Sequence, residues 1–268
     1  MLMLNKRPRG RVLLASNDIP ADYHADRLRW WTLNSPSWSA HIDADANRGA
    51  LLAKLAERTK TLARLAVDPA IVDLGCGEGA FLRAFRKIAP QATLRGVDFC
   101  SAMLAEARRR SDDSGLMYVL GDMERDDFVA PIRADVVTSI LAVDEMDQLV
   151  CAFSNIAKIL KPGGAAMLVV MDPAKEIERN RNELQDWLNN DAAFNSPILL
   201  VKTFPTTALR PVAPYSRIVR PLDQYTTAAT SAGLRAEGVE QWEHPVGLGQ
   251  YSGTLLFDIL IFRKTTVL

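Results

Sequence analysis

The chain has 268 residues, of which 48% are hydrophobic and 24% are charged. This balance is typical of a globular protein with a sizeable core and excludes a disordered chain. Lys and Arg together number 32, as do Asp and Glu, so the chain has no net charge that would attract a nucleic acid backbone.

The cysteines and the apolar runs limit the cellular setting. Cys76, Cys100 and Cys151 are scattered and lack CxxC spacing, which argues against a disulfide framework and against a structural zinc site. Residues 12–15 form an apolar run too short for a signal-peptide core, and no segment reaches membrane-spanning length. We therefore expect a cytoplasmic protein with no metal site and no membrane partner.

Residues 1–48 are polar and punctuated by aromatic residues, and a turn is expected at residues 34–36. This stretch predicts an N-terminal helical cap or lid. Its aromatic residues lie either on the packed side of the cap or in a ligand pocket; they are Tyr23, Trp30, Trp31 and Trp38. A helix is expected over residues 49–67, because leucines recur at helical spacing until Asp68-Pro69.

Strand and helix patterns alternate after residue 70, which predicts parallel βαβ units. The expected strands are 71–74, 93–98, 117–120, 134–141 and 165–171, and the expected helices are 80–88, 101–110 and 148–160. A Lys-Pro-Gly-Gly turn is expected at residues 161–164.

Residues 172–220 interrupt this alternation with a charged helix over residues 175–188 and a proline-rich stretch. We interpret them as a substrate-cap insertion over the sheet. A helix at 222–232, an extended segment at 234–242 and an apolar last strand at 254–262 complete the chain.

The most informative motif is a predicted strand that runs into a glycine-rich turn at residues 71–79, Ile-Val-Asp-Leu-Gly-Cys-Gly-Glu-Gly. Glycines let the backbone approach a ligand closely, and the helix that follows places its N-terminus at the same crevice. The spacing lacks the third glycine of the dinucleotide fingerprint G-x-G-x-x-G, which disfavours a dehydrogenase.

Asp73, followed by Gly75, Gly77 and Gly79, resembles the first motif of class I S-adenosylmethionine-dependent methyltransferases. The resemblance continues at Asp98, in the family's "D-x-S-x-x-M-L" pattern. It implies that Asp98 accepts hydrogen bonds from the ribose hydroxyls and that Phe99 and Met103 lie against the adenine. From the residues alone, Asp73 could instead bond to backbone, and Asp98 could cap a helix.

A second part of the resemblance follows the third strand, where Gly121-Asp122-Met123 is similar to the family's "G-D-A/M" turn. It implies that Asp122 accepts the adenine amino group and that Met123 contacts the ring. The residues alone also allow a turn aspartate at position 122. Leu141, at the exit of the fourth strand, and Cys76, which could be only a small filler, complete the expected cofactor contacts.

Candidate catalytic residues are fewer, because methyl transfer needs alignment and exclusion of water more than a strong acid or base. Many relatives carry histidine in the loop after the fourth strand, whereas this chain has Asp144 and Glu145 there. If the acceptor must lose a proton, the candidates are Asp144, Glu145, His41 and Tyr23. Arg210, Arg217 and Arg220 either form a solvated face or receive an acidic substrate group.

The resemblance implies a Rossmann-like, doubly wound α/β fold with a mostly parallel seven-stranded sheet and an antiparallel last strand. The expected domains are the cap at 1–48 and a methyltransferase domain at 49–268 that carries the insertion at 172–220.

The implied function is methyl transfer from S-adenosyl-L-methionine, with S-adenosyl-L-homocysteine as product, to an O, N or C atom of a small molecule. The alternatives are a non-catalytic S-adenosylmethionine-binding or regulatory protein and an NAD-dependent oxidoreductase. The sequence has neither an Asn/Asp-Pro-Pro-Tyr motif after the fourth strand nor a basic stripe, so a nucleic acid substrate is not expected. Monomer and homodimer both stay open.

Overall fold

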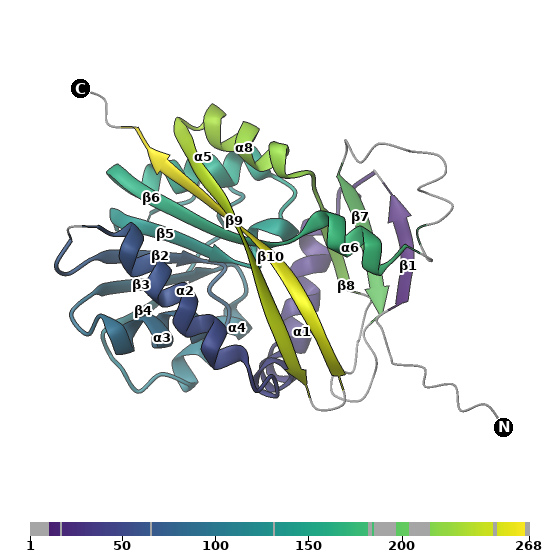
Figure 1. The fold of residues 1–268 in the computed structure, drawn as a ribbon, viewed down its shortest axis with the longest axis horizontal. Helices are drawn as coiled ribbons and strands as arrows, with labels where there is room; N and C mark the ends of the chain where they lie inside the picture. Colours follow the sequence, from purple (N-terminus) through teal and green to yellow (C-terminus); the bar gives the residue numbers. More distant parts are fainter. Residues whose placement is uncertain are drawn as a thin grey trace.

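A twisted sheet of seven strands with helices on both faces forms the body of the protein in the computed structural model (Figure 1). The structure describes residues 11–16, 18–64, 66–130, 132–181, 184, 197–203, 215–248 and 251–265. The strands of this sheet are β2 (Ala70–Leu74), β3 (Thr93–Asp98), β4 (Leu116–Leu120), β5 (Ala134–Ile140), β6 (Leu160–Met171), β9 (Leu234–Leu248) and β10 (Tyr251–Lys264).

The strands lie in the order β4-β3-β2-β5-β6-β10-β9. The first five strands in this order, β4, β3, β2, β5 and β6, pair in parallel with their neighbours. Strand β10 runs antiparallel to both β6 and β9. This arrangement confirms the predicted mostly parallel sheet with an antiparallel last strand. The chain passes from β2 to β3 on one side and later returns to β5 on the other, so a crevice is expected at the carboxyl ends of these strands.

Alternate residues of each strand serve the two faces of the sheet. On one face Val72 packs with α5 (Leu149–Ile159) and α8 (Leu222–Ser231). On the other face Ile71 packs with α2 (Arg48–Leu62), α3 (Ala80–Ile88) and α4 (Ser101–Arg109). Because helices cover both faces, the central strands are apolar almost throughout. None of the described helices is both long enough and apolar enough to cross a membrane.

A second sheet of three antiparallel strands connects the N-terminal segment to the insertion (Figure 1). Its strand β1 (Arg11–Ser16) pairs with β7 (Ile198–Thr203), which pairs with β8 (Tyr215–Val219). The sequence predicted only helical pieces within residues 1–48, and this was wrong for β1. The partner strand is distant in the chain, so no local pattern reveals the pairing.

Helix α1 (Tyr23–Asp43) continues through Pro36, where the sequence predicted a turn. Proline removes a backbone donor and usually breaks a helix. Tryptophans on both sides of Pro36 pack edge to face, with ring centroids 6.1 Å apart for Trp30 and Trp38 and 5.2 Å apart for Trp31 and Trp38. The three tryptophans belong to α1 itself, and Trp30 also packs against Tyr215 of β8 with ring centroids 4.9 Å apart. These contacts together outweigh the local preference for a break.

The turn expected at residues 161–164 and the charged helix expected at 175–188 differ from the structure or lie partly outside the described residues. Strand β6 begins at Leu160 and includes the predicted turn; its pairing with β5 is irregular there and becomes regular at Ala165. Helix α6 (Pro173–Arg179) covers the first part of the charged helix expected at 175–188. Most of its remainder, together with Arg210, lies outside the described residues.

Two carboxyl groups meet where β6 ends beside β10. Asp172 caps α6 by accepting a hydrogen bond of 2.6 Å from the Lys175 amide. The Gln241 amide group donates to Asp172 at 2.8 Å and to Asp258 at 3.4 Å. Burial and the nearby charge of Asp172 raise the pKa of Asp258 to about 6. Above that pH two like charges lie close together, which opposes folding.

Replacing Asp258 by Asn is expected to stabilise the protein at pH 8. The stabilising contribution of a carboxyl with a raised pKa is fully present below the usual value of 3.8 and is lost as the pH rises through about 6. Asparagine cannot ionise, so the free energy of unfolding should exceed that of the wild type by about 1 kcal/mol at pH 8.

Urea unfolding at pH 5 and pH 8 measures this difference. Asp127→Asn is the control, because the Asp127 side chain is 77% exposed. A gain for Asp258→Asn that is as large at pH 5 as at pH 8 would contradict the explanation by charge repulsion.

Candidate active site

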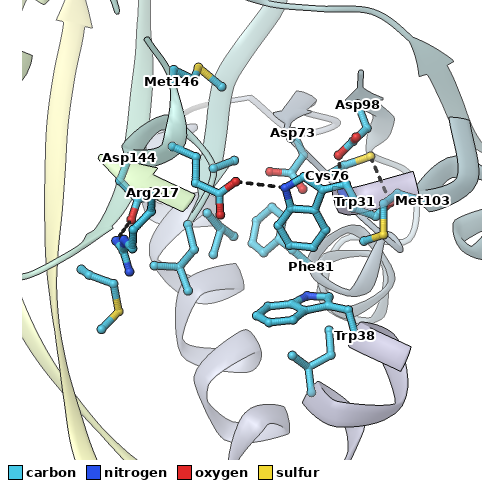
Figure 2. A pocket seen from close by; sticks show the side chains of 18 of the residues that line it. Trp31, Trp38, Asp73, Cys76, Phe81, Asp98, Met103, Asp144, Met146 and Arg217 are labelled. Carbon is cyan, nitrogen blue, oxygen red and sulfur yellow. Dashed lines mark hydrogen bonds and ion pairs between the residues drawn. The ribbon is translucent and has the colours of Figure 1, made fainter. Parts of the chain in front are cut away.

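A cavity of about 540 Å³ lies at the carboxyl ends of β2 to β5, within the common range for small-molecule sites. All ten residues expected to contact the cofactor line it: Asp73, Gly75, Cys76, Gly77, Asp98, Phe99, Met103, Asp122, Met123 and Leu141. Figure 2 shows Asp98 and Met103 on one side of the cavity and Asp144 with Arg217 on the other. The cavity therefore extends beyond the expected cofactor contacts.

The glycine-rich turn after β2 shapes a backbone cradle that suits an adenosyl ligand. Gly75 and Gly77 have φ angles of 69° and 53°, which side chains with a Cβ rarely adopt. A Cβ on Gly75 would collide with Ala142, and a Cβ on Gly77 would lie 3.1 Å from the end of Met103. A larger residue would therefore be strained at either position, and at Gly75 it would also displace Ala142, which lines the cavity.

The Asp98 carboxylate joins the glycine-rich turn to the next helix. It accepts hydrogen bonds of 2.9 Å from the Gly77 amide and of 2.9 Å from the Cys100 amide, at the start of α4. Burial raises the pKa of Asp98 to about 6. The N-cap residue of α4 is Cys100, so Asp98 closes a turn before the helix and is not its cap. The same side chain also lines the cavity, where ribose contact stays a prediction.

Asp73 is buried at the end of β2 and bonds to a side chain rather than to backbone. Thr138 of β5 donates to Asp73 at 2.7 Å. Burial, with a further contribution from the charge of Asp98, raises the pKa of Asp73 to about 7. A cationic group that enters the cavity would favour the ionised carboxylate.

His24 of α1 contacts two residues at the expected nucleoside end of the cavity, although it is not itself among the residues that line it. His24 Nε2 lies 2.6 Å from Asp122, and the His24 ring packs against Phe99 with centroids 5.6 Å apart. His24, Asp122 and Glu124 could together offer metal ligands. Both Glu124 oxygens already accept hydrogen bonds, however, so this cluster indicates no metal site.

Asp144 lies at the exit of β5 in the short helix η1 (Val143–Glu145) and pairs with an arginine of the small sheet. Asp144 Oδ2 lies 2.5 Å from Arg217 Nη2, and both side chains line the cavity. Among the described residues, the guanidinium of Arg217 forms a hydrogen bond to Asp144. The Nε atom of Arg217 is buried and has no hydrogen-bond partner among them. Because Asp144 bonds to Nη2 alone, this guanidinium has further donors that no hydrogen bond among the described residues occupies.

Glu145, next to Asp144, is contacted by helix α1 and by strand β8 of the small sheet. Trp31 Nε1 donates to its carboxylate at 3.0 Å, and the Tyr215 hydroxyl bonds to the other carboxylate oxygen. Burial and the neighbouring Asp144 charge raise the pKa of Glu145 to about 7. Near neutral pH a large share of Glu145 is thus uncharged.

The remaining base candidates are placed differently. The Tyr23 hydroxyl donates to the Glu145 carbonyl at 2.7 Å, and Tyr23 packs with Leu199 and Ile218 of the small sheet. Burial raises the pKa of Tyr23, so it is a poor base, and it is not among the residues that line the cavity. His41 belongs to α1, and its side chain lies outside the described part.

Sequence reasoning missed Arg27 and Glu124. Arg27 of α1 is buried, and it donates to the Glu124 carboxylate and, at 2.5 Å, to the Glu145 carbonyl. Glu124 also accepts the amides of Asp147 and Gln148. An arginine in a polar N-terminal helix gives no local signal of burial, so only the tertiary fold identifies this contact.

Comparison with known proteins finds methyltransferases among the similar sequences. Residues 71–164 match a family described as Methyltransferase domain. The chain is 25% identical to trans-aconitate 2-methyltransferase of Acidovorax sp. (strain JS42) over 182 residues, 66% of this chain and 67% of that protein. It is 36% identical to malonyl-[acyl-carrier protein] O-methyltransferase of Enterobacter lignolyticus (strain SCF1) over 94 residues, 35% of this chain and 36% of that protein.

A solved structure supports the fold. The S-adenosylmethionine-dependent methyltransferase from Methanosarcina mazei superposes with a TM-score of 0.60 at 14% identity. The superposition covers 76% of this chain and 95% of that chain.

We predict that cofactor affinity increases with pH, because an ionised Asp73 in the cavity would pair with the amino group of the ligand. With a pKa of about 7 in the free protein, most Asp73 carboxyls are protonated at pH 6. The dissociation constant of S-adenosylhomocysteine should therefore be about tenfold higher at pH 6 than at pH 8, as titration calorimetry can measure.

Asp73→Asn should bind more weakly and lose this pH dependence. Asp68→Asn is the matched control, because Asp68 is an exposed aspartate just before the same strand. Equal wild-type affinity at both pH values would exclude Asp73 as the titrating partner.

Proposed function

Since the chain is a class I S-adenosylmethionine-dependent methyltransferase, we propose that it methylates a carboxylate oxygen of a small organic acid. The observation that carries this proposal is Arg217, a guanidinium in the cavity beside the tip of β5. Two relatives are named for acceptors that contain carboxylic acids, trans-aconitate and a malonyl group. An arginine is the side chain best suited to orient a carboxylate.

The acceptor then needs no general base. A carboxylic acid is already ionised at neutral pH, so its oxygen is a nucleophile without losing a proton. Asp144 is then a positioning residue, because its Oδ2 lies 2.5 Å from Arg217 Nη2 and orients the guanidinium. Near its pKa of about 7 only about half of Glu145 is charged, which lowers the repulsion that an anion meets at this end of the cavity.

When bound, S-adenosylmethionine supplies a methyl group on a positively charged sulfur. The residues of this chain contribute alignment and exclusion of water. Arg217 would orient the acceptor, while Trp31 and Met146 shield the space between the two ends of the cavity. A carboxylate that reacts with a sulfonium loses its charge in the reaction, so an apolar surrounding favours it.

The two alternatives from sequence fit the cavity less well. A non-catalytic binding protein would not need a second space beside the cofactor contacts, yet the cavity extends to Arg217 and Leu255. An NAD-dependent oxidoreductase is disfavoured because the turn after β2, which contains Gly75 and Gly77, lacks the third glycine position of a dinucleotide-binding site.

Three finer assignments belong to the same proposal. Residues 1–48 and the insertion at 172–220 together form the cap over the acceptor, on a methyltransferase domain of residues 49–268. The protein acts in the cytoplasm, where its three cysteines would stay reduced. It works without a nucleic acid partner, as a monomer or a homodimer.

A methyl-ester assay tests the proposed function. The protein is incubated with methyl-labelled S-adenosylmethionine and a panel of carboxylic acids and amines, and the products are treated with alkali. We expect label on acids that alkali releases as methanol, because esters hydrolyse. Alkali-stable label on amines would contradict carboxylate methylation and favour an N-methyltransferase.

Removing the arginine and its partner together should abolish recognition of the acid. In Arg217→Gln/Asp144→Asn no buried charge is left unpaired, and kcat/KM for the acid should fall about a hundredfold. Affinity for S-adenosylhomocysteine should not change. Arg109→Gln is the control, because its side chain is 68% exposed. Unchanged kcat/KM in the double variant would remove Arg217 from the acceptor site.

A further inference from the structure

Beyond the expected cofactor contacts, the cavity is walled mainly by apolar side chains. We call this part the apolar chamber; it is formed by Trp31, Trp38 and Ile42 of α1, Leu51 and Leu55 of α2, and Leu255 of β10. Figure 2 shows Trp31 and Trp38 together with Phe81 between Asp98 and the Asp144–Arg217 pair. The chamber therefore adjoins both the expected cofactor site and Arg217.

The chamber belongs to the acceptor side of the sheet. The expected cofactor contacts come from the tips of β2, β3, β4 and β5, whereas Leu255 lies on β10, beyond β5 and β6. Helix α2 supplies Leu51 and Leu55 and packs beside α3, β5 and β9. A ligand in the chamber would thus lie next to the cofactor rather than in its place.

Most chamber side chains are only partly buried although they pack on the hydrophobic core. Leu51 and Leu255 contact the core cluster on one side, and Trp31, Trp38 and Ile42 are likewise of intermediate exposure. All five side chains line the cavity. Apolar surface of this kind gains free energy only when an apolar group of a ligand covers it.

Charged groups that line this half of the cavity are already paired with one another. Arg48 lies 2.9 Å from Asp43 and also bonds to Glu78. Arg179 lies 3.2 Å from Glu176. Among the described residues these pairs reduce the attraction for additional anionic groups, so the chamber favours an acceptor with one acidic end.

We infer that the acceptor is a monocarboxylic acid whose alkyl or aryl body fills the apolar chamber while its carboxylate reaches Arg217. The inference rests on the proposed carboxylate methylation and names its substrate class. A small polycarboxylate would leave Trp38, Ile42 and Leu51 exposed to water and would gain nothing from them. The apolar body, rather than a second charge, then provides selectivity.

Competition with a fluorescent probe tests the inference without turnover. The probe is 1-anilinonaphthalene-8-sulfonate, an apolar anion, bound to protein saturated with S-adenosylhomocysteine. Hexanoate, octanoate, decanoate, 2-naphthoate and trans-aconitate are the competitors. We expect the dissociation constant to fall about three- to fourfold for each added methylene, and trans-aconitate to compete poorly.

A matched pair of leucine variants assigns the binding to the chamber. Leu51→Asn places an amide in the chamber wall and should weaken decanoate at least tenfold, without changing the affinity for S-adenosylhomocysteine. Leu33→Asn is the same substitution on α1 at a residue that is 48% exposed and outside the cavity lining, and it should bind decanoate as the wild type does.

The outcomes separate the two proposals. Equal competition by trans-aconitate and decanoate, a flat methylene series, or equal losses in both leucine variants would overturn the inference. A graded series with no methyl ester formed on any acid would support the apolar chamber as a binding site and contradict carboxylate methylation. Ester formed on trans-aconitate but on none of the apolar acids would overturn the chamber and retain the proposed function.

Discussion

The packing of the N-terminal helix depends on a buried positive charge, that of Arg27. Its guanidinium donates to the Glu124 carboxylate and to the Glu145 carbonyl, and Glu124 also accepts the amides of Asp147 and Gln148. A buried charge that loses its partner destabilises a protein by about 3–5 kcal/mol. Helix α1, the turn after β4 and the turn after β5 are therefore coupled: the cap is held by the same contacts that shape both ends of the cavity.

This coupling also explains how so many ionisable groups can line an apolar cavity. Asp144 is neutralised by Arg217, and Arg48 is held between Asp43 and Glu78. The local field is therefore weaker than the number of carboxylates suggests. A reaction in which opposite charges cancel is suited to such a surrounding, because alignment and exclusion of water then provide most of the acceleration.

Much of the fold was predictable wherever the determining pattern is local. Helix α3 and strand β3 have the predicted bounds because turn residues delimit them: Gly79 precedes α3, and Pro90 separates α3 from β3. Strand β1 was missed, since its partner β7 lies far along the chain, and the break expected at Pro36 is overridden by the tryptophans that pack around it. The expected cofactor contacts share one cavity because parallel strands bring their carboxyl ends to one edge of the sheet.

Residue spacing within single βα units was enough to predict the parallel βαβ units, the glycine cradle and the carboxylates at the tips of β2, β3 and β4. The doubly wound order of the sheet followed from the family resemblance. Contacts between distant segments alone bury Arg27, place Tyr23 outside the cavity lining where it bonds to the Glu145 carbonyl, and bring Trp31 and Leu51 into one cavity with Arg217. The physical reason is that burial and pairing depend on which distant segments meet. A charged or aromatic residue has the same sequence signature in solvent as in a cavity wall.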